Sequence, residues 1–208
     1  MCELGQHDSP EDIYEYILDM GMRPNQSREE LIFFYRCVRH LLRKVSVVCE
    51  IGVEWGGTSA FLSHLLSGDG IMVGIDINST VAGINIPKVR EMIAPSVYQL
   101  IPYASTSTEA LSMLSDILGE RKIDVLFIDG DHRYDTVKLD YTNFHPFMRR
   151  PSIVAFHDIK MVSDTQNWPG HEMVGKYWDE LLRHNTDHIE ICLGNERNVY
   201  GIGLILIR

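Results

Sequence analysis

The chain has 208 residues, of which 45% are hydrophobic, and a formal net charge of −10. This length and composition suit one α/β domain with a full hydrophobic core. The negative charge argues against a broad nucleic-acid surface, because phosphate binding depends mainly on Lys and Arg. No apolar run is long enough to cross a bilayer, and residues 1–10 are too polar for a signal peptide. We therefore expect a cytoplasmic protein that binds neither nucleic acid nor membranes.

The cysteines agree with this compartment. None of the four shows a paired spacing. Cys49 and Cys192 lie in apolar segments, so we expect both to be reduced residues of the core.

The N-terminal segment, residues 1–44, is expected to form helices that pack on the remaining domain, residues 45–208. Ser9-Pro10 is typical of a helix start, and Gly21 ends that helix. The capping box that begins at Ser27 opens a longer helix, whose apolar positions keep a helical period as far as Val45. The loop Met22–Gln26 between the two helices leads toward the end of the first strand.

The remaining chain alternates apolar strands with amphipathic helices, and one of these helices is expected to run from Tyr134 to Pro151 with Met148 on its apolar side. Its last two strands are joined so briefly that they are antiparallel neighbours. Five strand–helix repeats and a final hairpin predict an α/β, Rossmann-like, three-layer sandwich with a mostly parallel sheet. The expected strands are Val47–Ile51, Ile71–Ile75, Val97–Ile101, Ile123–Ile128, Ser152–Phe156, Ile189–Leu193 and Val199–Ile207.

The first strand runs into a glycine-rich turn. Such a turn lets a ligand approach bare backbone. Its spacing does not fit the dinucleotide fingerprint and no P-loop lysine follows, so a pyrophosphate cradle is disfavoured. The turn suits S-adenosylmethionine, and the hypothesis is that Gly52, Gly57 and Thr58 hold the amino-acid end of this cofactor. The alternative is that the glycines only relieve crowding between strand and helix.

Polar residues end the other strands, where an open parallel sheet binds its ligands. Asp76 ends the second strand, in the position where a carboxylate accepts both hydroxyls of a ribose. The alternative is that Asp76 is a helix cap or a solvated acid of the turn. Ser105 or Thr106, after the third strand, bonds an adenine edge or, equally well, caps the following helix.

Four phrases in order resemble the class I S-adenosylmethionine-dependent methyltransferases: EIGVEWGGTS from Glu50, GIDI from Gly74, FIDGDHRY from Phe127 and FHDI from Phe156. The nearest group is the small "FIDGDHxY" family, related to catechol and macrolide-sugar O-methyltransferases. The resemblance implies seven strands in the order 3-2-1-4-5-7-6. Carried over by position, the cofactor contacts are Gln26, Glu50, Gly52, Gly56, Gly57, Thr58, Asp76, Ser105, Asp129 and His132.

Metal-dependent relatives bind a divalent cation, usually magnesium, at positions that match Asp129, His157 and Asp158. A metal lowers the pKa of the acceptor oxygen and holds it against the methyl group. His157 departs from these relatives, which commonly carry an acid or amide there, and imidazole suits zinc, iron or manganese better than magnesium. Metal-free catalysis at Asp129 is the equal alternative, with His132 or His157 as the general base. In a purely structural interpretation, these side chains only bond loop backbone or pack at a strand end.

The function expected from all this is S-adenosylmethionine-dependent O-methylation of a small molecule, a sugar or a phenol, with Mg or Mn as the candidate metal. The alternatives are a non-catalytic S-adenosylmethionine-binding module, an N-methyltransferase and, least favoured, a nucleotide-dependent oxidoreductase. The acceptor pocket is expected to involve the segment before Val45, Ile77–Ile93 and a lid over Met161–His171 that carries Trp168. Because the N-terminal helices are short, a second subunit of a homodimer is expected to cap the site.

Overall fold

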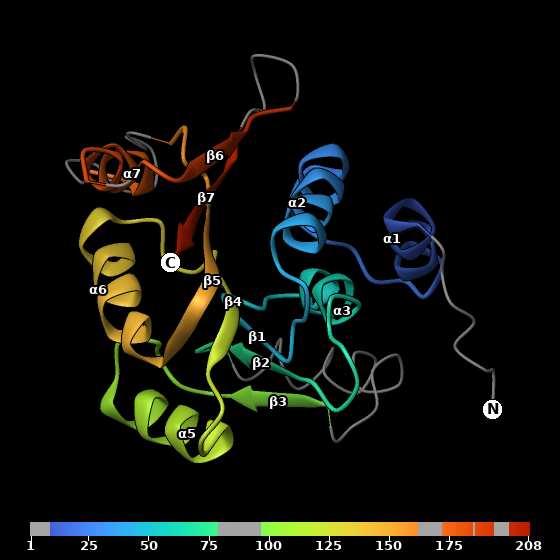
Figure 1. The fold of residues 1–208 in the computed structure, drawn as a ribbon, viewed down its shortest axis with the longest axis horizontal. Helices are drawn as coiled ribbons and strands as arrows, with labels where there is room; N and C mark the ends of the chain where they lie inside the picture. Colours follow the sequence, from blue (N-terminus) through green and yellow to red (C-terminus); the bar gives the residue numbers. More distant parts are fainter. Residues whose placement is uncertain (1–8, 79–96, 162–171, 185, 194–199) are drawn as a thin grey trace.

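The structure is a computed structural model that describes residues 9–78, 97–161, 172–184, 186–193 and 200–208. Helices and strands alternate along most of these ranges (Figure 1). The elements are α1 (Pro10–Asp19), α2 (Arg28–Leu41), β1 (Val47–Ile51), α3 (Gly57–Ser63), β2 (Ile71–Ile75), β3 (Tyr98–Ile101), α5 (Thr108–Leu118), β4 (Ile123–Ile128), α6 (Tyr134–Phe144), the 3-10 turn η1 (His145–Phe147), β5 (Met148–His157), α7 (Val174–Leu182), β6 (His188–Ile191) and β7 (Ile202–Ile207).

The seven strands form one sheet in the order β3-β2-β1-β4-β5-β7-β6. Strands β1 to β5 are parallel, whereas β7 is antiparallel to both β5 and β6. The predicted fold class and strand order are therefore confirmed. The parallel strands end at the same edge of the sheet, which is where the polar residues of the sequence motifs follow them.

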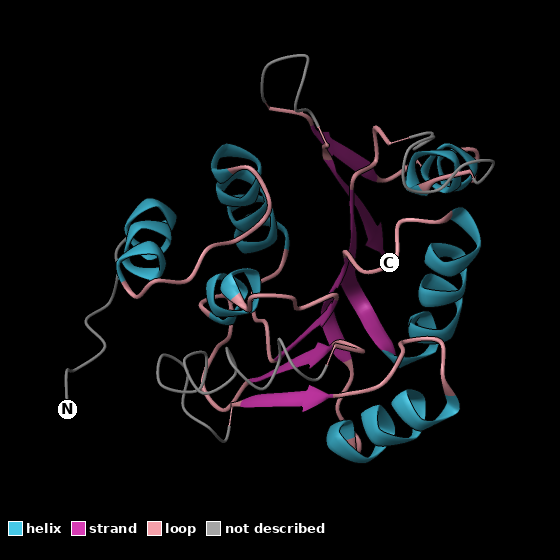
Figure 2. Ribbon diagram, turned by 180° about the vertical axis from the view of Figure 1, so that it is seen from behind, coloured by secondary structure: helices cyan, strands magenta, loops and turns pink. Residues whose placement is uncertain are grey.

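The helices cover both faces of the sheet. Helices α1, α2 and α3 lie on one face, and α5, α6 and α7 lie on the other (Figures 1 and 2). Alternate strand residues enter the two hydrophobic clusters: Val48 belongs to the cluster under α1–α3, while Val47 and Cys49 belong to the cluster under α5–α7. Both faces are buried, which explains why the parallel strands are nearly continuous apolar runs.

Two helices end earlier than their apolar period predicts. Helix α6 ends at Phe144 and Met148 begins β5, because Pro146 has no N–H to continue the helix. Helix α2 ends at Leu41, although Val45 beyond it is buried.

Only one of the two hydrogen bonds of the predicted capping box of α2 forms. The Ser27 hydroxyl accepts from the Glu30 N–H at 3.2 Å. The buried Glu30 carboxylate instead accepts from the Leu193 N–H at 3.1 Å, which ties α2 to the end of β6. Cys192 lies just beyond β6 and is only half-buried, so its expected place inside a strand is wrong.

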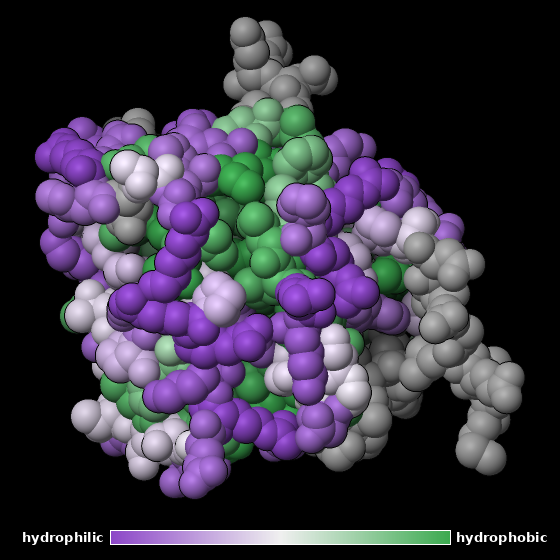
Figure 3. All heavy atoms as spheres, viewed as in Figure 1, coloured by the Kyte–Doolittle hydropathy of each residue, from purple (hydrophilic) through white to green (hydrophobic). Residues whose placement is uncertain are grey.

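Apolar side chains gather on one face over β6 and β7, beside α2 (Figure 3). A hollow of about 210 Å³ in this region is lined by residues that include Leu41, Ile189 and Leu206. It is separate from the cleft at the carboxyl ends of the strands. Within the described ranges, the helices are too short or too polar for any of them to span a membrane.

Candidate active site

A cleft of about 850 Å³ lies outside the carboxyl ends of the parallel strands. Apart from Glu50, every residue that the sequence analysis assigned to cofactor, metal or catalysis lines it. The predicted residues on its wall are Gln26, Gly52, Gly56, Gly57, Thr58, Asp76, Ser105, Asp129, His132, His157 and Asp158.

Glu50 lies beneath the glycine turn and not on the cleft. Its carboxylate accepts a hydrogen bond from the Ser59 hydroxyl, while its Oε1 atom is buried and has no partner among the described residues. Burial raises the pKa of Glu50 well above its ordinary value. Side chains alternate along the strand, so Glu50 lies on the same face as Val48, under α3. Its predicted contact with the cofactor stays a prediction.

The glycine turn is packed against backbone on two sides. Gly52 has φ +88°, and a Cβ there would overlap the Asp129 carbonyl group. A Cβ on Gly57 would overlap the backbone of Arg23 in the N-terminal loop. Both positions require glycine because the backbone of a neighbouring loop, and not the following helix, lies too close for a side chain. Both glycines also border the cleft.

Asp76 shapes this turn. Its Oδ2 atom accepts from the N–H groups of Val53 at 2.9 Å and Glu54 at 2.8 Å, and its Oδ1 atom accepts from Asn78 at 2.7 Å. Glu54 adopts a left-handed conformation with φ 43°. Next to it Trp55 is 50% exposed on the cleft, so it is a wall residue and not part of the core.

Gln26 joins the N-terminal loop to two sides of the cleft. The Thr58 hydroxyl donates to the Gln26 amide oxygen, and the Gln26 amide nitrogen donates to Oδ2 of Asp129. Gln26 is only 4% exposed. The structure thus places it at the site as a bridge between α3 and the end of β4.

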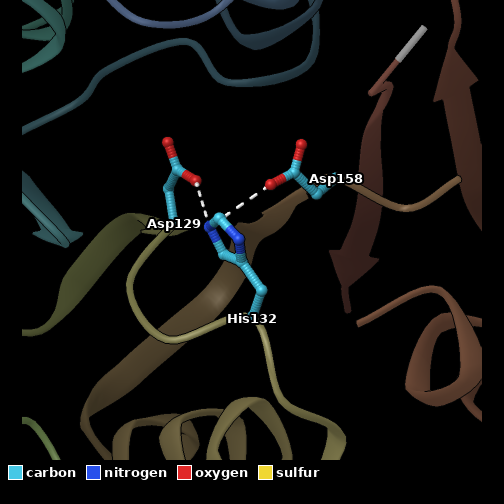
Figure 4. A group of neighbouring side chains, drawn as sticks. All are labelled: Asp129, His132 and Asp158. Carbon is cyan, nitrogen blue, oxygen red and sulfur yellow. Dashed lines mark ion pairs between the residues drawn. The ribbon is translucent and has the colours of Figure 1, made fainter. Parts of the chain in front are cut away.

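Two carboxylates and two imidazoles meet at the ends of β4 and β5. Nε2 of His132 lies 3.6 Å from Oδ1 of Asp129 and 3.3 Å from Oδ2 of Asp158, and its ring is placed between the two acids (Figure 4). Nδ1 of His157 lies 3.1 Å from Asp129 and 3.2 Å from Asp158. Asp158 holds a left-handed conformation with φ 60°, which is sparsely populated for a non-glycine residue and occurs often at functional sites.

The charges in this cluster support one another. Burial would raise the pKa of Asp129, but His157 and His132 hold it well below its ordinary value. The hydrogen bond with Asp129 raises the pKa of His132. Burial would lower the pKa of His157, but Asp129 and Asp158 raise it well above its ordinary value. An ionised Asp129 therefore faces imidazoles that bind protons tightly.

The same cluster has a donor set that fits a divalent cation. Three potential ligand atoms lie within 4.8 Å of one another, one each from Asp129, His132 and Asp158. Two carboxylates and an imidazole suit manganese, iron or zinc better than magnesium. This set contains His132 where the sequence analysis expected His157, whose Nε2 atom is buried and has no partner among the described residues.

Ser105 makes a contact that the sequence analysis missed. Its hydroxyl donates to Oδ1 of Asp140 in α6 at 2.6 Å, whereas Ser107 caps α5 by accepting from the Ala110 N–H at 3.1 Å. The cap interpretation is therefore wrong for Ser105. Asp140 stands on the apolar side of its helix with Val137 and Phe144, and an acid at that spacing was a signal that could have identified it.

The predicted lid and its Trp168 and His171 lie outside the described residues, which stop at Met161 and resume at Glu172. The same holds for the stretch from 79 to 93 that was expected to shape the acceptor pocket. These two expectations stay predictions.

Comparisons with known proteins agree with this geometry. Residues 49–159, more than half of the chain, match a protein family described as a methyltransferase domain. The fold is similar to that of TomG from Streptomyces achromogenes, an O-methyltransferase involved in tomaymycin synthesis and solved with S-adenosylmethionine; the TM-score is 0.71 at 19% identity over 98% of this chain and 92% of TomG. An O-methyltransferase from Bacillus cereus, solved with S-adenosylhomocysteine, gives a TM-score of 0.68 at 15% identity over 100% of this chain and 94% of the other.

One curated relative matches in sequence, protein y4gI from Sinorhizobium fredii, which is 37% identical over 76 residues. That match covers 36% of this chain and only 7% of the relative. The family match is the decisive finding: the chain belongs to the methyltransferase-domain family, and is a methyltransferase. Its fold is that of the S-adenosylmethionine-dependent members of this class.

Proposed function

We propose that the chain transfers the methyl group of S-adenosylmethionine to a hydroxyl group of a small molecule, with His132 as the general base. The observation that carries the proposal is that one cleft is lined both by the turn held by Asp76 and by the cluster of Asp129, His132 and Asp158. Catalysis of methyl transfer needs the acceptor oxygen held close to the methyl carbon, and a group that takes the proton.

In this proposal the nucleoside lies along the carboxyl ends of β1 and β2. Asp76 accepts from the ribose hydroxyls with the lone pairs that its backbone partners leave, and the Gly52–Thr58 turn holds the amino-acid end. Gln26 and Ser105 contribute from the two sides of the cleft, Gln26 mainly by fixing Thr58 and Asp129. The similarity in fold to proteins solved with this cofactor or its product supports this placement.

His132 is the better placed of the two candidate bases. Its side chain is 35% exposed, compared with 7% for His157, so it can reach an acceptor in the cleft. The acceptor hydroxyl gives its proton to the His132 imidazole, and its oxygen forms the new bond to the methyl carbon while the bond from that carbon to sulfur breaks. Asp129 and Asp158 stabilise the imidazolium that results. The buried His157 holds the two carboxylates in place through its Nδ1 atom.

Asp129, Asp158 and one histidine would hold a divalent cation in the metal-dependent version of this proposal. Such a cation would lower the pKa of the acceptor hydroxyl. The acceptor class expected is a sugar or phenol hydroxyl, and the expected homodimer belongs to the same proposal.

Isothermal titration with S-adenosylmethionine and S-adenosylhomocysteine tests the cofactor, and transfer of labelled methyl groups to a panel of phenols, sugars and amines tests the reaction. His132→Gln should lower turnover on the acceptor by about 10²- to 10⁴-fold while S-adenosylhomocysteine still binds. His184→Gln, an exposed histidine of the loop after α7, is the matched control and should change neither. Absence of binding by either nucleoside, or full turnover by His132→Gln, would contradict the proposal.

The metal is tested separately. Turnover after treatment with a chelator, and its recovery with manganese or magnesium, distinguishes the metal-dependent version from the metal-free one. Labelling of amines alone would show that nitrogen, and not oxygen, is the acceptor atom.

A further inference from the structure

Asp140 is a buried acid that borders the proposed nucleoside site and has no role in the chemistry described above. It is fully buried in α6, and its Oδ1 atom lies 2.6 Å from the hydroxyl of Ser105 on the cleft wall. Its second oxygen, Oδ2, is buried with no partner in the described part of the chain. Helices α5 and α6 lie on the same face of the sheet (Figure 1), and the hydrogen bond joins the loop before α5 to α6.

The surroundings of Asp140 favour its neutral form. An ionised carboxylate would leave one charged oxygen unpaired in an apolar layer. Burial raises the pKa of Asp140 to about 7, against the hydrogen bond from Ser105, which lowers it. The other titratable group that acts on Asp140 is Asp131, which adds negative charge but is paired with Arg133 at 2.9 Å. The buried thiol of Cys49 lies close enough for Asp140 to raise its pKa, so it stays neutral beside Asp140.

The protonation state of Asp140 sets the direction of the hydrogen bond to Ser105. A proton on Oδ2 would be a buried donor without an acceptor, whereas a proton on Oδ1 can be donated to the Ser105 oxygen. An unpaired buried carbonyl oxygen is tolerated better than an unpaired donor. In the neutral form Ser105 thus accepts from Asp140, and its own O–H is free to point into the cleft. In the ionised form Ser105 must donate to the carboxylate and offers the cleft only lone pairs.

We propose that Asp140 is a positioning residue for the nucleobase of the cofactor: in its neutral form it turns the Ser105 hydroxyl into a donor to N1 of adenine. This inference rests on the proposed function, because it requires the adenine end of the cofactor to lie beside Ser105. Adenine N1 is an acceptor, whereas hypoxanthine carries a hydrogen on N1. A donor at Ser105 therefore selects adenine, and an acceptor at Ser105 does not.

The test compares the Kd of S-adenosylhomocysteine with that of its inosine counterpart at about pH 6 and about pH 8, on either side of the Asp140 pKa of about 7. The two ligands share the same amino-acid end, so the ratio of their Kd values cancels titrations at the histidine cluster. The wild-type preference for adenine should fall by about tenfold between the lower and the higher pH, the worth of one hydrogen bond.

Asp140→Asn provides the rescue by a conservative variant. Its amide N–H donates to Ser105 at any pH, so the preference for adenine should stay high and no longer depend on pH. Asp140→Leu and Ser105→Ala should both show a low preference that is independent of pH. Asp135→Asn removes an exposed acid from the first turn of the same helix and should behave like the wild type.

A wild-type preference that does not change with pH, or that rises with pH, overturns the inference, and so does an Asp140→Asn variant that keeps the wild-type pH dependence. If Asp140→Asn does not fold, Ser105→Ala tests the same pair from the cleft side. Failure of the wild type to bind S-adenosylhomocysteine at either pH refutes the proposed function itself, which is a different result.

Discussion

Asp140→Asn should stabilise the free protein above neutral pH. The unfolded chain loses the Asp140 proton near the ordinary pKa of 3.8, whereas the folded chain keeps it up to about pH 7 because the carboxyl group is buried. A raised acid pKa means that the folded state loses stability as the pH rises from about 4 to about 7, and stays less stable beyond it. The shift corresponds to about 4 kcal/mol at full ionisation, which the asparagine variant avoids.

Urea unfolding of both proteins at about pH 5 and about pH 8 measures this effect. Between these values the free energy of unfolding should move in favour of Asp140→Asn by about 2 to 3 kcal/mol. The effects of other titrating groups, such as Asp129, cancel in the difference between the two proteins. Asp135→Asn is the control and should show no such change. A difference between Asp140→Asn and wild type that is the same at both pH values would refute the argument that Asp140 is buried as a neutral acid.

Three further changes test the architecture of the site. Asp76→Ala removes the acceptor of two N–H groups in the glycine turn and should weaken S-adenosylhomocysteine binding by at least about tenfold in titration calorimetry, with Asp76→Asn retaining more affinity; equal Kd values would exclude this role. Gly203→Ala places a Cβ 2.6 Å from the buried ring of Trp178 and should lower the free energy of unfolding by about 1 to 3 kcal/mol, so unchanged urea unfolding would contradict the packing. Gln26→Ala leaves an Asp129 oxygen without its partner and should cost about 1 to 3 kcal/mol of stability; a variant as stable as wild type would show that the bridge is not formed.

Much of the fold could be predicted because its signals are local. Each parallel strand is an apolar run that stops at a polar residue, and Asp76 and Asp129 mark the edge where the cleft lies. The final hairpin follows from its short connection. The strand order, however, came from a resemblance between motifs, because periodicity does not say which strands are neighbours.

The contacts that organise the site could not be predicted in this way. Gln26 and Asp129 are joined by a hydrogen bond across 103 positions of sequence, and nothing in either neighbourhood indicates the other. Glu50 stands in a motif, but that motif did not indicate that the alternation of its strand places it beside Val48, beneath the wall of the cleft. The strand-end pattern does not indicate Asp140, because this residue belongs to α6 and reaches the cleft wall through its hydrogen bond to Ser105.

The contact between Gly57 and the backbone of Arg23 has a practical consequence for anyone who redesigns this enzyme. A minimal fragment that starts at residue 45 would include every described strand. It would lack Gln26 and therefore the hydrogen bond that Gln26 donates to Asp129. The loop from Arg23 to Gln26 also borders the cleft at the carboxyl ends of the strands. Exchanging this short loop between homologues would therefore change the wall of the cleft while the sheet is left intact.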